Sequence, residues 1–94
     1  MNHSVFANNV IERESEALKI LSQNIPKDFS LLIEYILHFN GRVILVGMGK
    51  SGYIAKKIAA SLASTGTPAF FIHPGEASHG DLGMITNEDI VIML

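Results

Sequence analysis

Residues 42–52 read RVILVGMGKSG, and this stretch decides the fold class of the chain. The run at 42–47 is aliphatic after its first residue, a pattern typical of a parallel strand covered on both faces. Residues 51–64 return to helical spacing, and 69–72 (AFFI) form a second apolar run. Strand, glycine-rich turn, helix and strand in this order predict two parallel strands joined by a right-handed crossover.

The flanking segments extend this unit in both directions. Apolar residues at helical spacing predict an amphipathic helix over 3–24. After a break at Pro26, Asp28 can cap a second helix that ends near His38, and its nearly all-round apolar surface predicts burial on more than one side. We expect a glycine-rich loop over 74–87, with one helical turn near Leu82, and a third strand over 89–94.

These elements predict a leading helical segment at 1–40 and a truncated α/β domain at 41–94, the front half of a doubly wound parallel sheet. Within these 94 residues no helix follows the third strand. An aliphatic strand left at an open edge invites pairing with another chain. We therefore expect either self-association or a partner that completes the sheet.

The composition narrows the classes of protein. The chain has 94 residues, 48% of them hydrophobic and 17% charged, with a net charge of −2 and no cysteine. It is too apolar for a disordered chain, it has no basic surface for nucleic acid, and it has no thiol chemistry. No apolar run approaches the roughly 18 residues that span a bilayer, and the amino terminus lacks the features of a signal peptide. We expect a cytoplasmic globular chain with neither a nucleic-acid nor a membrane partner.

The loop between the first strand and its helix is the chemical centre. It contains Gly47, Gly49, Lys50, Ser51 and Gly52. Glycines let the backbone approach a ligand closely, the start of the helix favours phosphate, and the lysine adds an ammonium group at the carboxyl end of the strand.

Three interpretations of this loop compete. The Gly-x-Gly-x-x-Gly spacing matches a dinucleotide fingerprint, but Ile72 and His73 stand where the second strand should end in an acidic residue. A P-loop fails because Ile44 occupies the position of its first glycine. A plain tight turn explains Gly47 and Gly52 but gives no reason for Lys50.

A second cluster follows, with Gly66 and Thr67 before the second strand and a polar loop after it. That loop carries His73, Glu76, His79 and Asp81. Imidazole nitrogens can bind zinc or form hydrogen bonds with sugar hydroxyl groups, and nothing in the sequence fixes a complete zinc site.

Residues 46–52 (VGMGKSG), 63–77 (ASTGTPAFFIHPGEA) and 78–84 (SHGDLGM) closely resemble the arabinose 5-phosphate isomerases of the sugar isomerase (SIS) domain family. The resemblance covers about residues 11–94 and implies a flavodoxin-like parallel sheet and an oligomer with sites near subunit interfaces. It also implies interconversion of arabinose 5-phosphate and ribulose 5-phosphate, which in Gram-negative bacteria feeds the Kdo sugar of lipopolysaccharide.

The resemblance carries roles over to particular residues. Lys50 resembles the catalytically relevant lysine of the family, while Gly66, Thr67, His73 and His79 resemble substrate contacts. The histidine at 73 resembles a position that can also take zinc, although an isomerisation through an enediol requires no cofactor.

The family's phosphate-binding loop, catalytic glutamates and third histidine lie downstream and have no counterpart in these 94 residues. We therefore expect a truncated isomerase-like chain, inactive alone, that acts as a homo-oligomer or with a complementing downstream fragment. Whether the chain is itself an enzyme stays open. The alternatives are a non-catalytic sugar-phosphate-binding module or remnant, and a nucleotide-binding half-domain.

Overall fold

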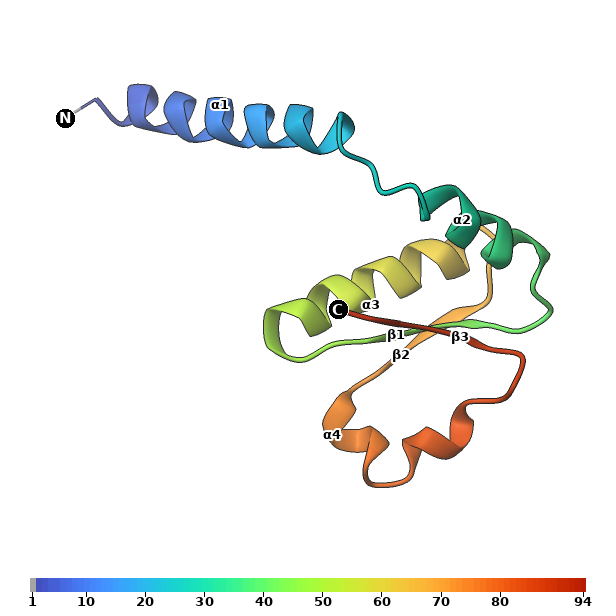
Figure 1. Cartoon of the computed structure of the whole chain (residues 1–94). Coiled ribbons are helices and arrows are strands. Elements are labelled where there is room, and N and C mark those ends of the chain that lie inside the picture. Colours follow the sequence, from blue (N-terminus) through green and yellow to red (C-terminus); the bar gives the residue numbers. More distant parts are fainter. Residues whose placement is uncertain (1) are drawn as a thin grey trace. The chain divides into compact units, whose positions relative to one another are not determined.

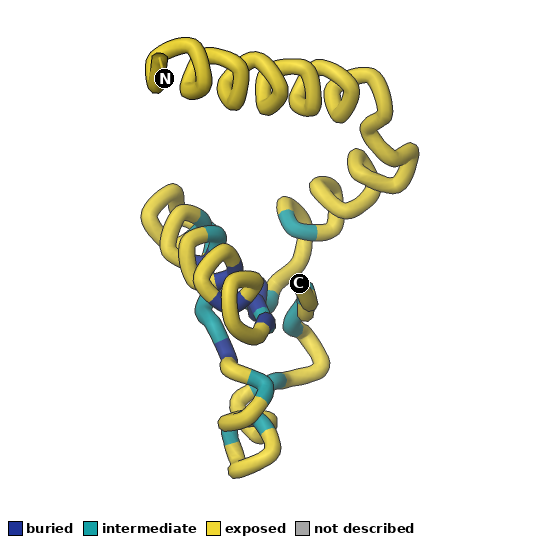
Figure 2. Tube along the Cα trace, turned by 90° about the vertical axis from the view of Figure 1, so that its left-hand side faces the viewer, coloured by how far each residue is buried: buried dark blue, intermediate teal, exposed yellow. Residues whose placement is uncertain are grey.

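The computed structural model describes residues 2–94. Two compact units divide between Leu32 and Ile33, and each is described by itself. In the first, α1 (His3–Ser22) begins where the Asn2 side chain accepts hydrogen bonds from the backbone N–H groups of Ser4 and Val5, at 3.0 and 3.3 Å. The predicted helix is confirmed, although none of its residues is buried, as Figure 2 shows.

The second helix, α2 (Phe29–His38), has the predicted position but not the predicted burial. Only Ile36 is half-buried, where it packs against the core, and the remaining side chains are exposed. The prediction of burial on more than one side was therefore wrong, because Ile36 is the one described side chain of this helix that packs against the core cluster. Asp28 does not cap it through its side chain either, since its carboxylate forms no hydrogen bond with any described residue; its backbone carbonyl accepts from Leu32 N–H.

The sheet consists of β1 (Val43–Val46), β2 (Ala69–Ile72) and β3 (Ile90–Met93). Its strand order is β2-β1-β3, and both pairs are parallel, with Val43 opposite Ala69 on one side and Ile90 on the other. The predicted α/β class, parallel pairing and all three strands are confirmed. The central strand is buried, as its uninterrupted aliphatic sequence predicts.

The long helix α3 (Gly49–Ser64) packs on one face of this sheet (Figure 1). Ala55 and Ala59 meet Val43 and Leu45 in the core, where small helix residues let the backbone approach the strand. Phe71 of β2 packs against the edge of the same cluster. The crossover thus holds the ends of β1 and β2 in fixed positions, and these ends carry the candidate site.

An ion pair fixes the opposite, amino edge of the sheet. Arg42 donates from its backbone N–H to Asp89 Oδ1 at 2.9 Å and from Nη2 to Asp89 Oδ2 at 3.0 Å. The same guanidinium donates to the carbonyl of Met84 at 2.6 Å, and the backbone N–H of Thr86 donates to Asp89 Oδ2 at 2.7 Å. The start of β1 is thereby tied to the loop that enters β3.

The connection between β2 and β3 contains α4 (Pro74–Ala77) and a 3₁₀ turn, η1 (Asp81–Met84). The turn expected near Leu82 is confirmed, whereas α4 was not predicted. Its signal was Pro74, which suits the first position of a helix because proline has a fixed φ and no N–H to leave unpaired. Among the helices of residues 2–94, none is both long and apolar enough to cross a membrane.

Candidate functional site

The glycine loop lies at the carboxyl end of β1, and its glycines are required for distinct physical reasons. A Cβ on Gly47 would stand 2.9 Å from the backbone of Ser51, and one on Gly52 would stand 2.8 Å from the carbonyl oxygen of Gly47. These two glycines therefore let the first turn of α3 close onto the strand. Gly49 has φ +57°, a left-handed conformation that side chains disfavour, and its α-carbon faces open space.

Lys50 and Ser51 occupy the first turn of α3, and both are exposed. The ammonium group of Lys50 makes no ion pair with any described residue between 2 and 94. Its position at the carboxyl edge of a parallel sheet is where such folds bind ligands. The structure therefore places this lysine where the sequence predicts it, with its charge available.

His73 follows β2 directly and opens onto the same edge. Its Nδ1 accepts a hydrogen bond of 2.9 Å from the backbone N–H of Gly75, which caps α4. In a neutral imidazole whose Nδ1 accepts, the proton is assigned to Nε2, which is then a donor. The ring also meets Phe71 edge to face, with centroids 6.5 Å apart and planes at 78°. Two contacts thus restrain this histidine.

A small pocket of about 120 Å³ brings the glycine loop and this histidine together. Its lining residues are Gly49, Gly52, Tyr53, Lys56, Phe71 and His73. Sequence reasoning singled out the two glycines and the histidine but missed Tyr53 and Lys56. Helical periodicity could have found them, because residues three, four and seven positions after Gly49 share its face of the helix.

His79 lies between α4 and η1 in the exposed part of the loop, where its backbone N–H donates to the carbonyl of Glu76 at 3.0 Å. It lines neither this pocket nor the larger one described below. Glu76 is exposed and Asp81 is half-buried, and neither of them lines the pocket that contains His73. Lys50 does not line that pocket either. Of the predicted histidine cluster, only His73 lines the pocket with the glycine loop.

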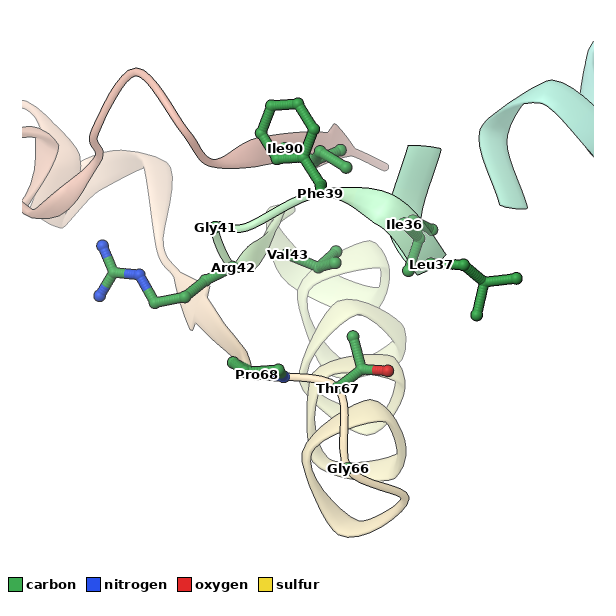
Figure 3. A pocket seen from close by; sticks show the side chains of 10 residues that line it. All are labelled: Ile36, Leu37, Phe39, Gly41, Arg42, Val43, Gly66, Thr67, Pro68 and Ile90. Carbon is green, nitrogen blue, oxygen red and sulfur yellow. The ribbon is translucent and has the colours of Figure 1, made fainter. Parts of the chain in front are cut away.

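Gly66 and Thr67 lie at the other end of β2, at the amino edge of the sheet (Figure 3). They close α3: Gly66 has φ +98°, and the N–H of Thr67 donates to the carbonyl of Leu62 at 2.9 Å, the pattern of a helix C-cap. They also line a pocket of about 330 Å³ with residues of α2 and β1. They do not line the pocket that contains His73, and their role as substrate contacts stays a prediction.

The described residues do not fit a zinc ion at His73. Nowhere in residues 2–94 do three or more histidine, cysteine or acidic side chains gather in a way that could hold a metal. A histidine ligand also normally donates its second N–H to an acceptor, whereas Nδ1 of His73 accepts from a backbone N–H.

A comparison with protein families agrees with this fold, which has a glycine loop, a parallel sheet and a helix that joins β1 to β2. Residues 36–94 match the model of the SIS domain, and the chain belongs to that family. The protein RP505 of Rickettsia prowazekii is 60% identical over 93 residues, 99% of this chain. The arabinose 5-phosphate isomerase KdsD of Yersinia pestis is 60% identical over 85 residues, 90% of this chain.

A solved structure agrees with both the fold and the resemblance. The protein c3406 of E. coli CFT073, in complex with arabinose 5-phosphate, superposes with a TM-score of 0.87 at 41% identity, over 99% of this chain and 51% of that one. The chain spans 29% of the length of the Rickettsia relative and 26% of the Yersinia one.

Proposed function

We propose that this chain provides one part of an arabinose 5-phosphate isomerase site and does not isomerise the sugar alone. The observation that carries the proposal is that the glycine loop and His73 line one pocket at one edge of the sheet. In addition, 90% of this chain aligns at 60% identity with an arabinose 5-phosphate isomerase. The substrate is a pentose phosphate, interconverted between its aldose and ketose forms, and the step supplies the Kdo sugar of lipopolysaccharide.

The isomerisation reaction determines which chemical groups the site must supply. A base removes the proton on C2, next to the aldehyde carbon, and the aldehyde oxygen takes a proton to give an enediol. The ketose forms when C1 takes a proton and the hydroxyl group on C2 loses one. Negative charge develops on oxygen during the first step, and a nearby ammonium group or N–H donor stabilises it. The Lys50 ammonium and the Nε2–H of His73 are the groups of this chain suited to that role.

The base is the group that these residues do not supply. The loop carboxylates Glu76 and Asp81 lie outside the pocket that contains His73. Loss of a general base alone costs roughly 10²- to 10⁴-fold in rate. Residues downstream in the relatives, from a complementing fragment or another copy of a longer chain, would have to provide the base and the phosphate-binding loop.

A non-catalytic sugar-phosphate-binding module is the second candidate. It is favoured by the same pocket, whose lining includes a lysine and a histidine but no acidic side chain. Both candidates require the chain to bind a sugar phosphate, and they differ in whether added downstream residues restore turnover.

The protein would work in the cytoplasm, where the pentose phosphates are made and consumed.

Two measurements on one preparation separate these candidates. Thermal unfolding is followed with and without arabinose 5-phosphate, because a ligand that binds only the folded state raises the midpoint by mass action. Ribulose 5-phosphate formation is then assayed with and without a fragment of the Yersinia relative that begins after its matched region. Turnover only in the mixture supports the isomerase part. A raised midpoint without turnover supports the binding module, and no response in either measurement rejects both.

A further inference from the structure

The pocket beside His73 is small. Its volume of about 120 Å³ equals the share of roughly four water molecules, whereas pockets that enclose a whole small-molecule ligand usually measure about 300–1,000 Å³. The pocket therefore suits one chemical group, of the size of a phosphate, rather than a complete substrate. The groups on its walls indicate which kind.

Lys56 provides the positive charge of this pocket. Its Nζ lies 5.2 Å from the ring centroid of Phe71 and 5.6 Å from that of Tyr53, both within cation–π distance. Two aromatic faces thus hold the end of a long, flexible side chain, which reduces the ordering cost of binding. Within residues 2–94, no carboxylate forms an ion pair with this lysine.

His73 provides a second donor. Because its Nδ1 accepts from Gly75 N–H, its Nε2 carries the proton of the neutral ring, and the ring is held edge to face against Phe71. One aromatic side chain, Phe71, therefore contacts both the histidine ring and the lysine ammonium. The pocket has two donors restrained on a common platform, and an acidic side chain is absent from its lining.

We propose that Lys56 and His73 form a subsite for a single phosphate-sized oxyanion. Charge-assisted hydrogen bonds from the ammonium and from Nε2–H would hold the anion between Lys56 and His73. The subsite shares the Nε2–H of His73 with the proposed isomerase site. It does not depend on turnover, because it requires only oxyanion binding by the present residues. Its occupant is either free phosphate or the phosphate group of a sugar phosphate.

The test is a titration of the ¹⁵N-labelled chain with sodium phosphate, followed by NMR against sodium chloride at matched ionic strength. We expect saturable shifts at Gly49, Lys56 and Gly75. Lys56→Met should weaken binding at least about tenfold, because a hydrogen bond to a charged group is lost, and Lys56→Arg should retain it. Lys57→Met is the matched control, since it removes the same charge from the adjacent position, outside the pocket.

Several outcomes would overturn the proposal. They are the absence of saturation, equal losses in Lys56→Met and Lys57→Met, and ring ¹⁵N shifts that place the proton of His73 on Nδ1. The spectra of each variant also report whether it is folded. If Lys56→Met does not fold, Lys56→Arg still tests the proposal, because loss of phosphate binding in a folded Lys56→Arg variant would contradict it.

Titrations with arabinose 5-phosphate and with arabinose identify the source of the anion. In one outcome, Lys56→Met weakens the binding of phosphate and of the sugar phosphate equally and leaves that of arabinose unchanged. This result assigns the pocket to the phosphate group of the substrate. A loss for inorganic phosphate alone assigns it to a free anion. Lack of turnover in the complemented isomerase, with Lys56-dependent phosphate binding intact, would reject the proposed function and leave the subsite standing.

Discussion

Arg42 and Asp89 form a two-pronged ion pair at the amino edge of the sheet, with Nε and Nη2 of the arginine 3.2 and 3.0 Å from the two carboxylate oxygens. The carboxylate side chain is only 1% exposed, while the arginine is 39% exposed and lies over the ring of Phe70. The pair joins the residues that immediately precede β1 and β3, which lie far apart in the sequence. It also satisfies the backbone N–H groups of Arg42 and Thr86.

This ion pair predicts a pH dependence of stability. The hydrogen bonds from Arg42 and then Thr86 hold the pKa of Asp89 well below its usual range. A carboxylate whose pKa is lower in the folded state contributes stability above its unfolded pKa of about 3.9, and that contribution is lost as pH falls through the folded value. The melting midpoint of the chain should therefore fall as pH is lowered from about 4.

Asp89→Asn should lower the midpoint by several degrees near neutral pH and flatten its decline in acid. Thermal unfolding followed by circular dichroism between neutral pH and about pH 2.5 measures both effects. Glu88→Gln is the control, because the neighbouring carboxylate makes no ion pair with the described residues 2–94. Parallel acid profiles of wild type and Asp89→Asn would contradict the assignment.

Gly47→Ala should destabilise the fold by about 1–3 kcal/mol, because the new Cβ would stand 2.9 Å from the backbone of Ser51 and force the helix away from the strand. Gly83→Ala is the matched control: its Cβ would meet nothing within 4 Å and its φ is not positive, so its effect should be within about 1 kcal/mol of zero. Urea unfolding of both variants measures the difference. Equal effects would mean that the close approach of loop and helix is relaxed in solution.

Lys50→Ala should abolish ribulose 5-phosphate formation in the complemented isomerase and leave the melting midpoint unchanged, because the side chain is exposed and makes no ion pair with the described residues. Lys57→Ala, on the same helix, controls for the loss of one positive charge. Turnover of the Lys50 variant at the wild-type rate would remove this residue from the mechanism.

Met93→Lys should reduce self-association of the chain. The side chain is 78% exposed on β3, which pairs with β1 on one side only, and charged residues on edge strands oppose pairing with other chains. Sedimentation velocity over a range of concentrations measures the effect. Leu82→Lys replaces another exposed apolar side chain, outside the sheet, and should leave the association as in wild type. A wild-type chain that stays monomeric throughout would show that the edge is already protected.

The sequence predicts the α/β core well because local pattern and tertiary packing agree there. The aliphatic run at 43–46 is both a good strand and the most buried strand. Burial of α2 was not predictable from its own apolar composition, because burial depends on what covers a helix, and only Ile36 meets the core. Composition describes a helix surface and says nothing of its neighbours.

The candidate site follows the same division. The positions of Lys50 and His73 were predictable, because residues after parallel strands lie at the carboxyl edge of the sheet, while their roles stay predictions. The contact between Lys56 and Phe71 was not predictable. It joins a face of the helix to a face of the strand, and the sequence does not determine how the two align. Gly66 and Thr67 show the converse: their motif is plain in sequence, and the structure gives them a helix-capping role away from Lys50.

The central position of β1 has a consequence for the order of folding. Val43 pairs with Ala69, 26 residues away, and with Ile90, 47 residues away. Closing the longer loop costs about 0.5 kcal/mol more chain entropy, and more distant contacts form more slowly. We expect β1, α3 and β2 to condense first and β3 to join them last. During that interval the most aliphatic strand of the chain has one unpaired edge, so the moment of greatest exposure to misassembly falls before the sheet is complete.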